Sequence, residues 1–289
     1  MRLVIDSNYL CYRAMYAVGG LSYEEKKVGT IFGFLRQILK LSEQFRTKDF
    51  IFCWDSKQSY RKLISEDYKA NRRKGLSEGE IEDFEIAYSQ FDELRDKVLP
   101  YMGFKNIFHQ TGYEADDLIA WIVMRFPDAT VIVSGDHDLF QLLVNNKFCP
   151  VAMYNFKVLN DETRFTEDWF GLKPKDWIKV KAIAGCATDN VIGVVGVGEL
   201  TAAKYLAGIL KSGKKVAAIE GAEDLIAFNH RLVGLPFVGR KAIKIGGLQE
   251  DQISADKFRV TFGQYGFRSL ISEEGSKGWL DSFFGGARG

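Results

Sequence analysis

The stretch ATVIVSGDHDLF, residues 129–140, places an apolar run rich in β-branched side chains directly before two acidic residues. Such a run predicts a buried strand that ends at Asp136, with Asp138 two positions further on. The runs LVID and DFIFCWD end in the same way, at Asp6 and Asp55. Strands of this kind, alternating with helical segments, predict an α/β fold with a mostly parallel central sheet flanked by helices.

The segments between these strands support the same fold class. KNIFHQ (residues 105–110) predicts one more strand, and apolar side chains at helical spacing predict a helix over residues 30–45. A second predicted helix, over residues 114–125, begins with acids that suit the amino end of a helix dipole. Strand and helix therefore alternate through the first half of the chain.

The pattern changes after this alternation, which sets the expected domains. VAMYNFKVLNDETRF (residues 151–165) predicts a hairpin-like tail to the sheet. From residue 166 onward the sequence becomes helical and is punctuated by glycine. We therefore expect a core domain over residues 1–165 and a helical region over residues 166–289.

The composition fits a folded protein without a broad charged surface. Of the 289 residues, 46% are hydrophobic and 27% are charged, and the formal net charge is +1. A chain of this size can bury a substantial core, and a nucleic-acid surface on it has to be a local concentration of cations. The four cysteines lack metal-binding spacing, and no apolar run is long enough to cross a bilayer. We expect a soluble cytoplasmic protein with no membrane partner.

The acids at the strand ends are the strongest functional signal. The carboxyl ends of parallel strands open onto one crevice, and the motif YEADDL adds Glu114, Asp116 and Asp117 at a helix start. Each acid alone also suits a helix cap. Two carboxylates about 4 Å apart, however, repel by roughly 4 kcal/mol at an effective dielectric of about 20. Together the acids predict a bound cation.

The ligand type indicates which cation. Oxygen ligands favour Mg²⁺ or Mn²⁺ over Zn²⁺, and the three histidines are scattered along the chain. The number of acids suits two ions roughly 3.5–4 Å apart, the geometry used for in-line attack on a phosphodiester. Metal-dependent phosphodiester hydrolysis is therefore the leading chemistry.

A charged segment at residues 56–86 interrupts the α/β pattern. It contains few apolar side chains, and Tyr60 and Tyr68 stand among its cations. The segment fits either a solvated helix face or a groove that tracks phosphates and stacks bases. Its basic part carries Lys57, Arg61, Lys62, Lys69, Arg72, Arg73 and Lys74.

Taken in order, the motifs resemble one known family. They span Leu3 to about Tyr205 and read VIDSNYLCYRA, FCWDSKQSYRK, DYKANRR, GYEADDLIA, SGDHDLFQLL and TDNVIGVVGVGELTAAKYL. The series resembles the 5′-nuclease or flap endonuclease superfamily, especially the bacteriophage 5′-exonucleases and the 5′-nuclease domain of bacterial DNA polymerase I. The resemblance implies a PIN-like α/β core, a helical arch over about residues 56–95 and a helix-three-turn-helix over about residues 174–210.

The resemblance also implies roles for individual residues. Lys69 and Arg72 resemble the family's cations at the base of the arch, which clamp the scissile phosphate, and Tyr68 resembles the aromatic residue on which a terminal base stacks. Other arch cations implied to contact DNA are Lys57, Arg61, Lys62 and Arg73. The implied metal ligands are Asp6, Asp55, Glu114, Asp116, Asp117, Asp136, Asp138 and Asp189.

The glycine-rich stretch GVVGVGELTAAKYL matches neither common phosphate-binding loop. A P-loop needs lysine after its last glycine, where this chain has Glu199, and the dinucleotide fingerprint fails because Thr201 replaces its third glycine. A plain helix-packing motif is one alternative. The resemblance instead implies that Gly196, Gly198, Thr201 and Lys204 grip the backbone of duplex DNA, with K⁺ bound at the turn.

The resulting expectation is a structure-specific 5′-nuclease. The resemblance implies hydrolysis with two Mg²⁺ ions, for which Mn²⁺ can substitute, at junctions of single- and double-stranded DNA. The implied partners are DNA with a 5′ flap, a nick or a 5′ single-stranded end, RNA/DNA primer hybrids and replisome proteins. The chain is expected to act as a monomer in the cytoplasm of a bacterial cell or phage-infected host.

Two alternatives stay open. A non-catalytic junction-binding protein of the same fold loses the acids, which this chain retains. A PIN-type ribonuclease is typically shorter, lacks the glycine-turn helix pair and prefers single-stranded RNA. Haloacid-type phosphatases, by contrast, need an acid two residues after the first one, and Asn8 stands there.

Cys186 departs from the family pattern. Most relatives carry an acid three residues before the one at Asp189, whereas GCATDN has a thiol at that position. A neutral thiol is a poor ligand for Mg²⁺. We therefore expect the outer metal site to be weaker, or to bind its ion through water.

Overall fold

The structure is a computed structural model that describes residues 1–271 and 279–285, without the side chains of residues 72, 73, 279, 281 and 282. The chain forms two compact units. Unit 1 consists of Met1–Trp54, Leu76–Phe108 and Ile245–Gly289, and unit 2 consists of Asp55–Gly75 and His109–Lys244. This division differs from the boundary expected near residue 165, because the chain on both sides of that residue packs within unit 2.

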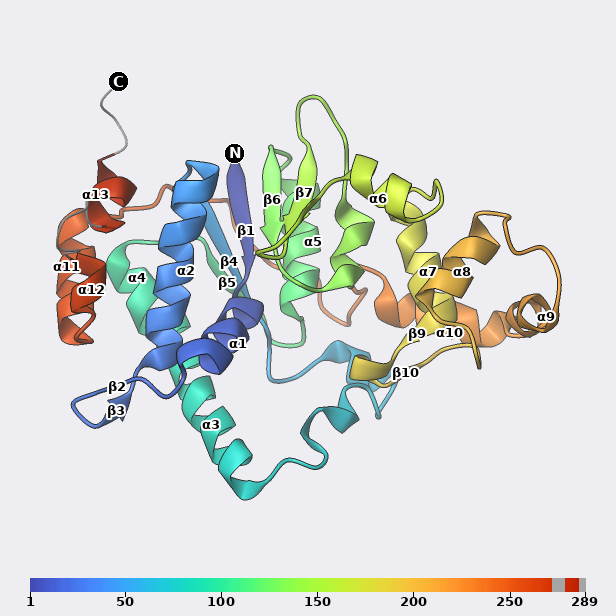
Figure 1. Cartoon of the computed structure of the whole chain (residues 1–289), viewed down its shortest axis with the longest axis horizontal. Helices are drawn as coiled ribbons and strands as arrows, with labels where there is room; N and C mark the ends of the chain where they lie inside the picture. The colour runs from blue at the N-terminus through green and yellow to red at the C-terminus, as the bar shows by residue number, and fades with distance from the viewer. Residues whose placement is uncertain (272–278, 286–289) are drawn as a thin grey trace. The chain divides into compact units, whose positions relative to one another are not determined.

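Unit 1 is built on strands covered by helices. β1 (Arg2–Asp6) pairs in parallel with β4 (Phe50–Trp54), and β5 (Ile107–His109) lies on the other side of β4. Every residue of β4 is buried, as expected for a strand covered on both faces. Figure 1 shows α1 (Ser7–Val18) and α2 (Gly29–Phe45) beside these strands.

The remaining elements of unit 1 are short except for α3 (Glu78–Glu93). α3 begins at a capping box. The Glu80 side chain accepts a hydrogen bond of 2.8 Å from the backbone nitrogen of Ser77, and the Ser77 hydroxyl accepts one of 3.3 Å from the backbone nitrogen of Glu80. The others are β2 (Ser22–Tyr23), β3 (Lys26–Lys27), the π-helical turn η3 (Leu94–Val98), α4 (Leu99–Met102), α11 (Ala255–Gln264), α12 (Arg268–Ile271) and α13 (Trp279–Phe284).

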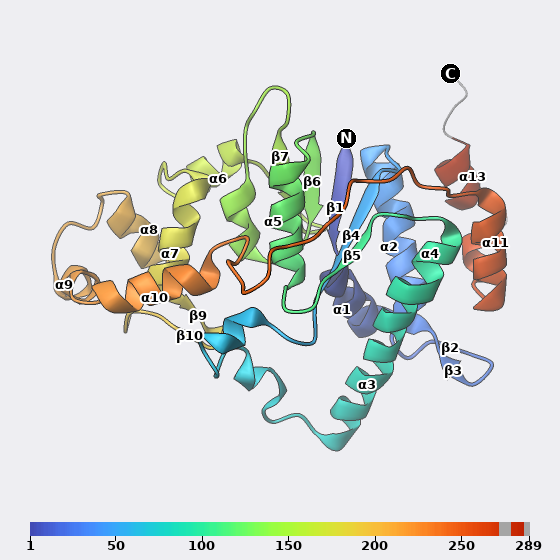
Figure 2. The same cartoon turned by 180° about the vertical axis from the view of Figure 1, so that it is seen from behind.

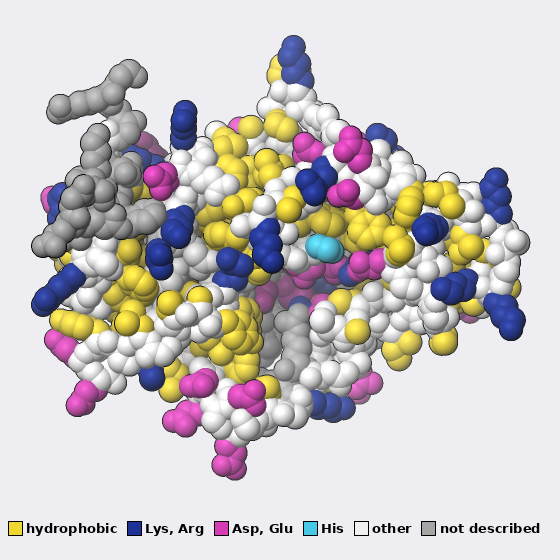
Figure 3. Space-filling view, viewed as in Figure 1, with side chains coloured by type: hydrophobic (Ala, Val, Ile, Leu, Met, Phe, Trp, Pro, Cys, Tyr) yellow, Lys and Arg dark blue, Asp and Glu magenta, His cyan; other side chains and the backbone are white. Residues whose placement is uncertain are grey.

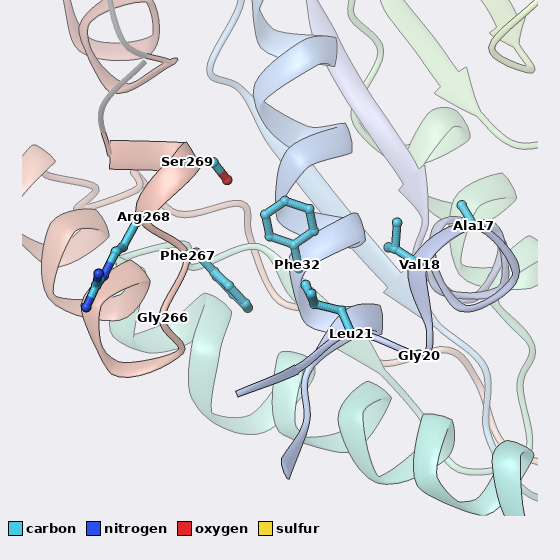
Figure 4. Close-up of a pocket in the computed structure, with 9 residues that line it drawn as sticks. All are labelled: Ala17, Val18, Gly20, Leu21, Phe32, Gly266, Phe267, Arg268 and Ser269. Atoms are coloured by element: carbon cyan, nitrogen blue, oxygen red, sulfur yellow. The ribbon is translucent and has the colours of Figure 1, made fainter. Parts of the chain in front are cut away.

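A cavity of about 620 Å³ opens in unit 1 between α1, α2 and the start of α12. Figure 4 shows Phe32 and Phe267 facing each other across it, and their ring centroids lie 5.2 Å apart. The guanidinium group of Arg268 points away from the cavity (Figure 4). The lining is mostly apolar and contains no acid, so this larger cavity is not the carboxylate site that the sequence predicts.

Unit 2 holds the second group of strands and most of the helices. β6 (Thr130–Val133) pairs in parallel with β7 (Val151–Tyr154), which pairs antiparallel with β8 (Leu159–Asn160). Figure 2 shows α5 (Ala115–Arg125) lying across β6 and β7. The helices α7 (Trp177–Ala184), α8 (Glu199–Leu206) and α10 (Glu223–Val233) pack together.

The other elements of unit 2 are short turns and helices. They are η1 (Tyr60–Leu63), η2 (Ala70–Arg73), η4 (His137–Leu142), α6 (Glu162–Asp168), η5 (Pro174–Asp176), β9 (Gly185–Cys186), η6 (Ala187–Asp189), β10 (Val191–Ile192) and α9 (Lys214–Glu220).

The predicted fold class is confirmed: mostly parallel strands are flanked by helices, and a strand forms within each predicted apolar run. The predicted hairpin-like tail is present as β7 and β8, although its last residues begin α6. The segment expected to form an arch is divided, since residues 56–75 form the turns η1 and η2 in unit 2 and α3 belongs to unit 1. Within the described ranges, no helix has both the length and the apolar character needed to cross a bilayer.

Candidate active site

Three of the predicted acids meet at the amino end of α5. Glu114 is the N-cap of this helix, and Asp117 completes a capping box with it. Asp55 accepts a hydrogen bond of 2.8 Å from the backbone nitrogen of Ala115. The first N–H groups of a helix lack partners within the helix and attract carboxylates, which explains why YEADDL starts a helix here.

A small pocket in unit 2 collects acids from three segments of the chain. Its volume is about 10 Å³, room for about one water molecule. The acids reach it from the start of α5, from η4 and from the loop between α7 and α8. The polar residues of this acid pocket are Arg61, Tyr68, Glu114, Asp116, Asp138, Cys186 and Asp189.

Asp136 and Asp138 stand at the start of η4. Asp136 caps this turn by accepting a hydrogen bond of 2.9 Å from the backbone nitrogen of Asp138. Asp138 Oδ1 lies 2.8 Å from Lys181 Nζ, so this buried oxygen is held in an ion pair with the lysine. Burial, together with the charge of Asp136, raises the pKa of Asp138 to about 6 against the opposing effect of Lys181.

Lys69 and Tyr68 bind the carboxylates on the other side of the acid pocket. Lys69 Nζ lies 2.8 Å from Glu114 Oε2 and 3.8 Å from Asp189 Oδ2. The Tyr68 hydroxyl lies within hydrogen-bonding distance of the same two oxygens, at 3.0 and 3.1 Å. Although burial of Glu114 favours its neutral form, Lys69 and Arg61 lower the pKa of Glu114 to about 2. Glu114 is therefore ionised in the folded protein.

The predicted motifs DYKANRR and TDN are hydrogen-bonded to each other next to Lys69 and Tyr68. The backbone nitrogen of Lys69 donates to the carbonyl of Asp189 at 2.8 Å. The Asn71 side chain donates to Asn190 Oδ1 at 2.8 Å, and Asn190 in turn donates to the carbonyl of Asp67 at 2.9 Å. The motif DYKANRR is thus held directly against the loop TDN, which the sequence alone does not indicate.

Arg61 and Asp117 form a buried ion pair. The guanidinium group binds both carboxylate oxygens, at 2.7 and 2.8 Å, and its Nε donates to the carbonyl of Leu232 at 2.7 Å. Asp117 also accepts from the backbone nitrogens of Glu114 and Phe237, at 3.1 and 2.8 Å. Each oxygen of Asp117 therefore has two donors, which fills its ordinary capacity for hydrogen bonds.

Three side chains lie in surroundings that do not suit the DNA-binding or metal-binding roles that the resemblance implies. Arg61 is 3% exposed and Tyr68 is 4% exposed, so neither presents its side chain to DNA on the surface. Asp117 is fully buried and saturated by donors, so its oxygens are not open to a metal ion. The physical reason is the same in each case: burial in unit 2 pairs these polar groups with one another.

The helix pair α7 and α8 forms in the segment expected to grip duplex DNA. Gly196 has a φ of +75°, which glycine adopts without strain, and Gly198 is the N-cap of α8. A side chain at Gly193 would place its Cβ 2.0 Å from the carbonyl oxygen of Ala184, so the turn needs glycine there. Gly196 and Gly198 are exposed, and Thr201 and Lys204 are half-buried.

Lysines gather on this part of unit 2. Figure 3 shows cationic side chains around α8 and α9, where Lys211, Lys214 and Lys215 are exposed. Phosphate contacts need local positive charge, and the net charge of the whole chain is only +1. The exposed lysines at α9 can supply part of this local charge.

The other predicted residues are not among those that line the acid pocket, or have side chains outside the described part of the structure. Asp6, in unit 1, ends β1 and caps α1 by accepting a hydrogen bond of 3.0 Å from the backbone nitrogen of Tyr9. Lys57 and Lys62 are exposed in unit 2. The side chains of Arg72 and Arg73 lie outside the described residues.

Sequence reasoning missed Lys181 and Glu199. Lys181 is 5% exposed and binds Asp138 and Glu199 at 2.8 and 2.9 Å. The sequence feature that could have identified Lys181 is a charged residue inside the apolar run WIKVKAIAG. The same run also contains Lys179, which is exposed. Sequence spacing alone therefore could not separate the two lysines.

Three acids of the pocket, Glu114, Asp138 and Asp189, are paired with lysines in the described structure. Among the described residues, no group of three or more histidine, cysteine or acidic side chains is arranged to hold a metal ion. Glu114 and Asp189 instead contact Lys69, and Asp138 contacts Lys181.

The α/β fold with acids at strand and helix ends is typical of metal-dependent nucleases, and the relatives of the chain place it in this class. The chain belongs to the 5′-3′ exonuclease family: the profile described as 5′-3′ exonuclease, N-terminal resolvase-like domain, matches residues 1–173. The chain is 34% identical over 215 residues to a 5′-3′ exonuclease of Bacillus subtilis, a match covering 71% of this chain and 69% of the relative.

A polymerase also shares this region. The chain is 32% identical over 214 residues to the thermostable DNA polymerase I of Thermus thermophilus, a match that covers 71% of this chain. It spans only 23% of that polymerase. The likeness therefore concerns one part of a much longer protein.

Solved structures share the fold. T5 5′-exonuclease with bound zinc superposes with a TM-score of 0.68 at 21% identity, covering 81% of this chain and 89% of that one. The catalytic core of Rad2 in complex with DNA substrate gives a TM-score of 0.52 at 17% identity, covering 91% of this chain and 86% of that one. At these identities the likeness establishes the fold.

Proposed function

We propose that the chain is a structure-specific 5′-nuclease that hydrolyses phosphodiester bonds of DNA near junctions between single and double strands. The observation that carries the proposal is the acid pocket, in which carboxylates from three segments converge beside Lys69. Clusters of carboxylates hold divalent cations that act on phosphates. The family description and the DNA substrate named for the Rad2 structure support DNA as the substrate class.

The acid pocket offers donors of the kind that hard divalent cations prefer. They are carboxylate oxygens, which suit Mg²⁺ and Mn²⁺. Bound ions of this kind activate a water molecule and stabilise the leaving oxygen. The residues of unit 2 proposed to hold Mg²⁺ ions, two in number, are Asp55, Glu114, Asp116, Asp136, Asp138 and Asp189, while Asp6 of unit 1 keeps only the ligand role that the resemblance implies.

Asp117 has a different role in this proposal. Because its oxygens are occupied by Arg61 and two backbone nitrogens, it orients Glu114 and the start of α5. Arg61 then acts through Asp117, as a residue that positions the pocket wall. Neither side chain needs to contact the substrate.

Cationic side chains and the glycine turn bind the phosphates of the DNA. Lys69 reaches the pocket carboxylates with its ammonium group, so a phosphate held at those carboxylates comes within its range, where it stabilises developing charge. The exposed turn at Gly196 and Gly198, with Lys204, holds the duplex backbone without reading its sequence. K⁺ at this turn belongs to the same proposal.

The wider role follows from the substrate class. We infer action on 5′ flaps, nicks and 5′ single-stranded ends, removal of RNA primers from RNA/DNA hybrids, and work as a cytoplasmic monomer with replisome proteins. Mn²⁺ is expected to replace Mg²⁺, because both ions prefer oxygen ligands.

A labelled 5′-flap duplex, incubated with and without Mg²⁺, tests the proposal. We expect cleavage near the junction only with Mg²⁺, and we expect Asp136→Asn to abolish cleavage while retaining flap binding. Undiminished cleavage by a folded Asp136→Asn variant contradicts the proposal. Binding without cleavage by the wild-type chain favours a junction-binding protein, and preferential cleavage of single-stranded RNA favours a PIN-type ribonuclease.

A further inference from the structure

Lys181 is a buried lysine shared between two acids on different elements. It stands in α7, and its ammonium group lies 2.8 Å from Asp138 Oδ1 and 2.9 Å from Glu199 Oε1. Asp138 belongs to the acid pocket, whereas Glu199 is the first residue of α8. Because lysine is rarely buried unless it is paired, these contacts explain how the ammonium group can lie in this place.

The two acids differ in what else surrounds them. The side chain of Asp138 is 14% exposed, whereas the side chain of Glu199 is 33% exposed. Water can therefore replace Lys181 at Glu199 more easily than at Asp138. The ammonium group is the main compensation for the buried charge of Asp138.

Cys186 lies on the same side of the acid pocket and supplies no charge there. Burial raises the pKa of its thiol, and its sulfur contacts Thr188 Oγ1 at 3.1 Å. The α7 side of the pocket therefore offers the carboxylate of Asp138 to a cation, with a fixed ammonium group already beside it.

We propose that Lys181 is a positioning residue that competes with divalent cations for Asp138, and that Glu199 sets the strength of this competition by holding part of the ammonium charge. The inference rests on the proposed function in one respect, since it takes Asp138 as a metal ligand. It goes further in assigning a role to Lys181 and Glu199.

The position of Glu199 makes the competition between Lys181 and the metal ion sensitive to what binds at the start of α8. Glu199 directly follows the exposed turn that contains Gly196 and Gly198. A phosphate backbone held at this turn brings negative charge close to Lys181 and Glu199. This charge changes the ion pair between Lys181 and Glu199, and with it the strength of the ion pair between Lys181 and Asp138. Duplex binding and metal binding are then coupled through one side chain.

Opposite effects of two substitutions distinguish this competition from a purely structural ion pair. Lys181→Met removes the competing charge, so the affinity for the metal rises. Glu199→Gln leaves the ammonium group to Asp138 alone, so the affinity falls. If the three residues only hold α7, α8 and η4 together, both substitutions loosen the pocket and lower the affinity.

The experiment measures Mn²⁺ binding to the full chain without DNA, by electron paramagnetic resonance of the free ion. We expect Lys181→Met to tighten binding and Glu199→Gln to weaken it, each about five-fold or more. Lys179→Met is the matched control, because Lys179 lies on the same helix and makes an exposed pair with Asp176 at 2.9 Å. It should bind Mn²⁺ like the wild type.

Thermal unfolding shows which variants fold. If Lys181→Met does not fold, Lys181→Gln takes its place, because it also removes the charge and keeps a polar group that can bond Asp138 and Glu199; tighter Mn²⁺ binding by this variant is then the expected result. Equal losses in both variants, or no change in Glu199→Gln, overturn the competition while wild-type Mn²⁺ binding leaves the proposed function standing. A wild-type chain that binds no Mn²⁺ overturns both.

Discussion

The ammonium group of Lys69 lies 2.8 Å from Glu114 Oε2 and 3.8 Å from Asp189 Oδ2, so one side chain contacts two carboxylates of the acid pocket. Its backbone has a φ of +58°, a left-handed conformation that is uncommon outside glycine, and its backbone nitrogen is bound to the carbonyl of Asp189. The chain thus accepts a less favourable backbone geometry at the point where Lys69 enters the pocket.

Lys69→Met should slow cleavage of a 5′-flap duplex by about 100-fold to 1000-fold, the usual loss when a group that stabilises transition-state charge is removed. Single-turnover kinetics at saturating enzyme separate this loss from weaker binding. Lys157→Met is the control, since Lys157 is exposed in the loop between β7 and β8. A rate that stays within two-fold of the control contradicts a role of Lys69 at the scissile phosphate.

The buried pair of Arg61 and Asp117 should be essential for stability. Arg61→Leu leaves the carboxylate of Asp117 buried without its partner, and we expect the free energy of unfolding to fall by about 3–5 kcal/mol. The double substitution Arg61→Leu with Asp117→Leu should recover part of this loss, because no unpaired charge remains. Urea unfolding measures both variants.

An exposed pair provides the matched control. Arg164 and Asp168 in α6 lie 3.5 Å apart with side chains 51% and 56% exposed, so Arg164→Leu should change stability by only about 0.5 kcal/mol. If Arg61→Leu unfolds like the wild type and loses only affinity for DNA, then Arg61 contacts DNA as the sequence predicted and the positioning role is wrong.

The sequence predicted the strands and the acids because both depend on local features. The apolar runs that form β1, β4 and β6 end in acids, and YEADDL has the composition of a helix start. The pairing of Arg61 with Asp117 and of Lys181 with Asp138 could not be predicted, because the partners are separated along the chain and meet only when unit 2 folds.

The same limit explains the residues whose placement differs from the prediction. Tyr68 stands among cations in the sequence, which favours a base-stacking surface, yet packing buries its ring against Ala182, Val191 and Leu232. A single sequence contains the charge pattern of a segment but not the elements that cover it.

Asp138 should destabilise the metal-free protein near neutral pH. Burial and the charge of Asp136 raise its pKa from 3.8 to about 6, so the folded protein binds this proton more tightly than the unfolded chain does. The free energy of unfolding contributed by this group therefore falls as the pH rises from about 4 to about 6, and the loss persists at higher pH.

Asp138→Asn should remove that loss. In EDTA we expect the free energy of unfolding of the variant, relative to that of the wild type, to rise as the pH rises from about 4 to about 6, while the loss of a partner for the buried Lys181 opposes a net gain. Urea unfolding at several pH values measures the difference, which should level off below about pH 4. A stability difference that is the same at both ends of this range shows that the charge of Asp138 is not its cause.

Cys186→Asp should strengthen metal binding on the α7 side of the acid pocket. Cys186 lines the pocket, and burial raises the pKa of its thiol, so it presents a neutral sulfur where a carboxylate would attract Mg²⁺. We expect the variant to reach half-maximal cleavage of a 5′-flap duplex at a lower Mg²⁺ concentration, by about five-fold or more. Cys149→Asp, at a half-buried position outside the pocket, controls for added charge alone. An unchanged Mg²⁺ requirement in a folded Cys186→Asp variant shows that the thiol does not limit the metal site, and the weaker outer site expected from the sequence is then wrong.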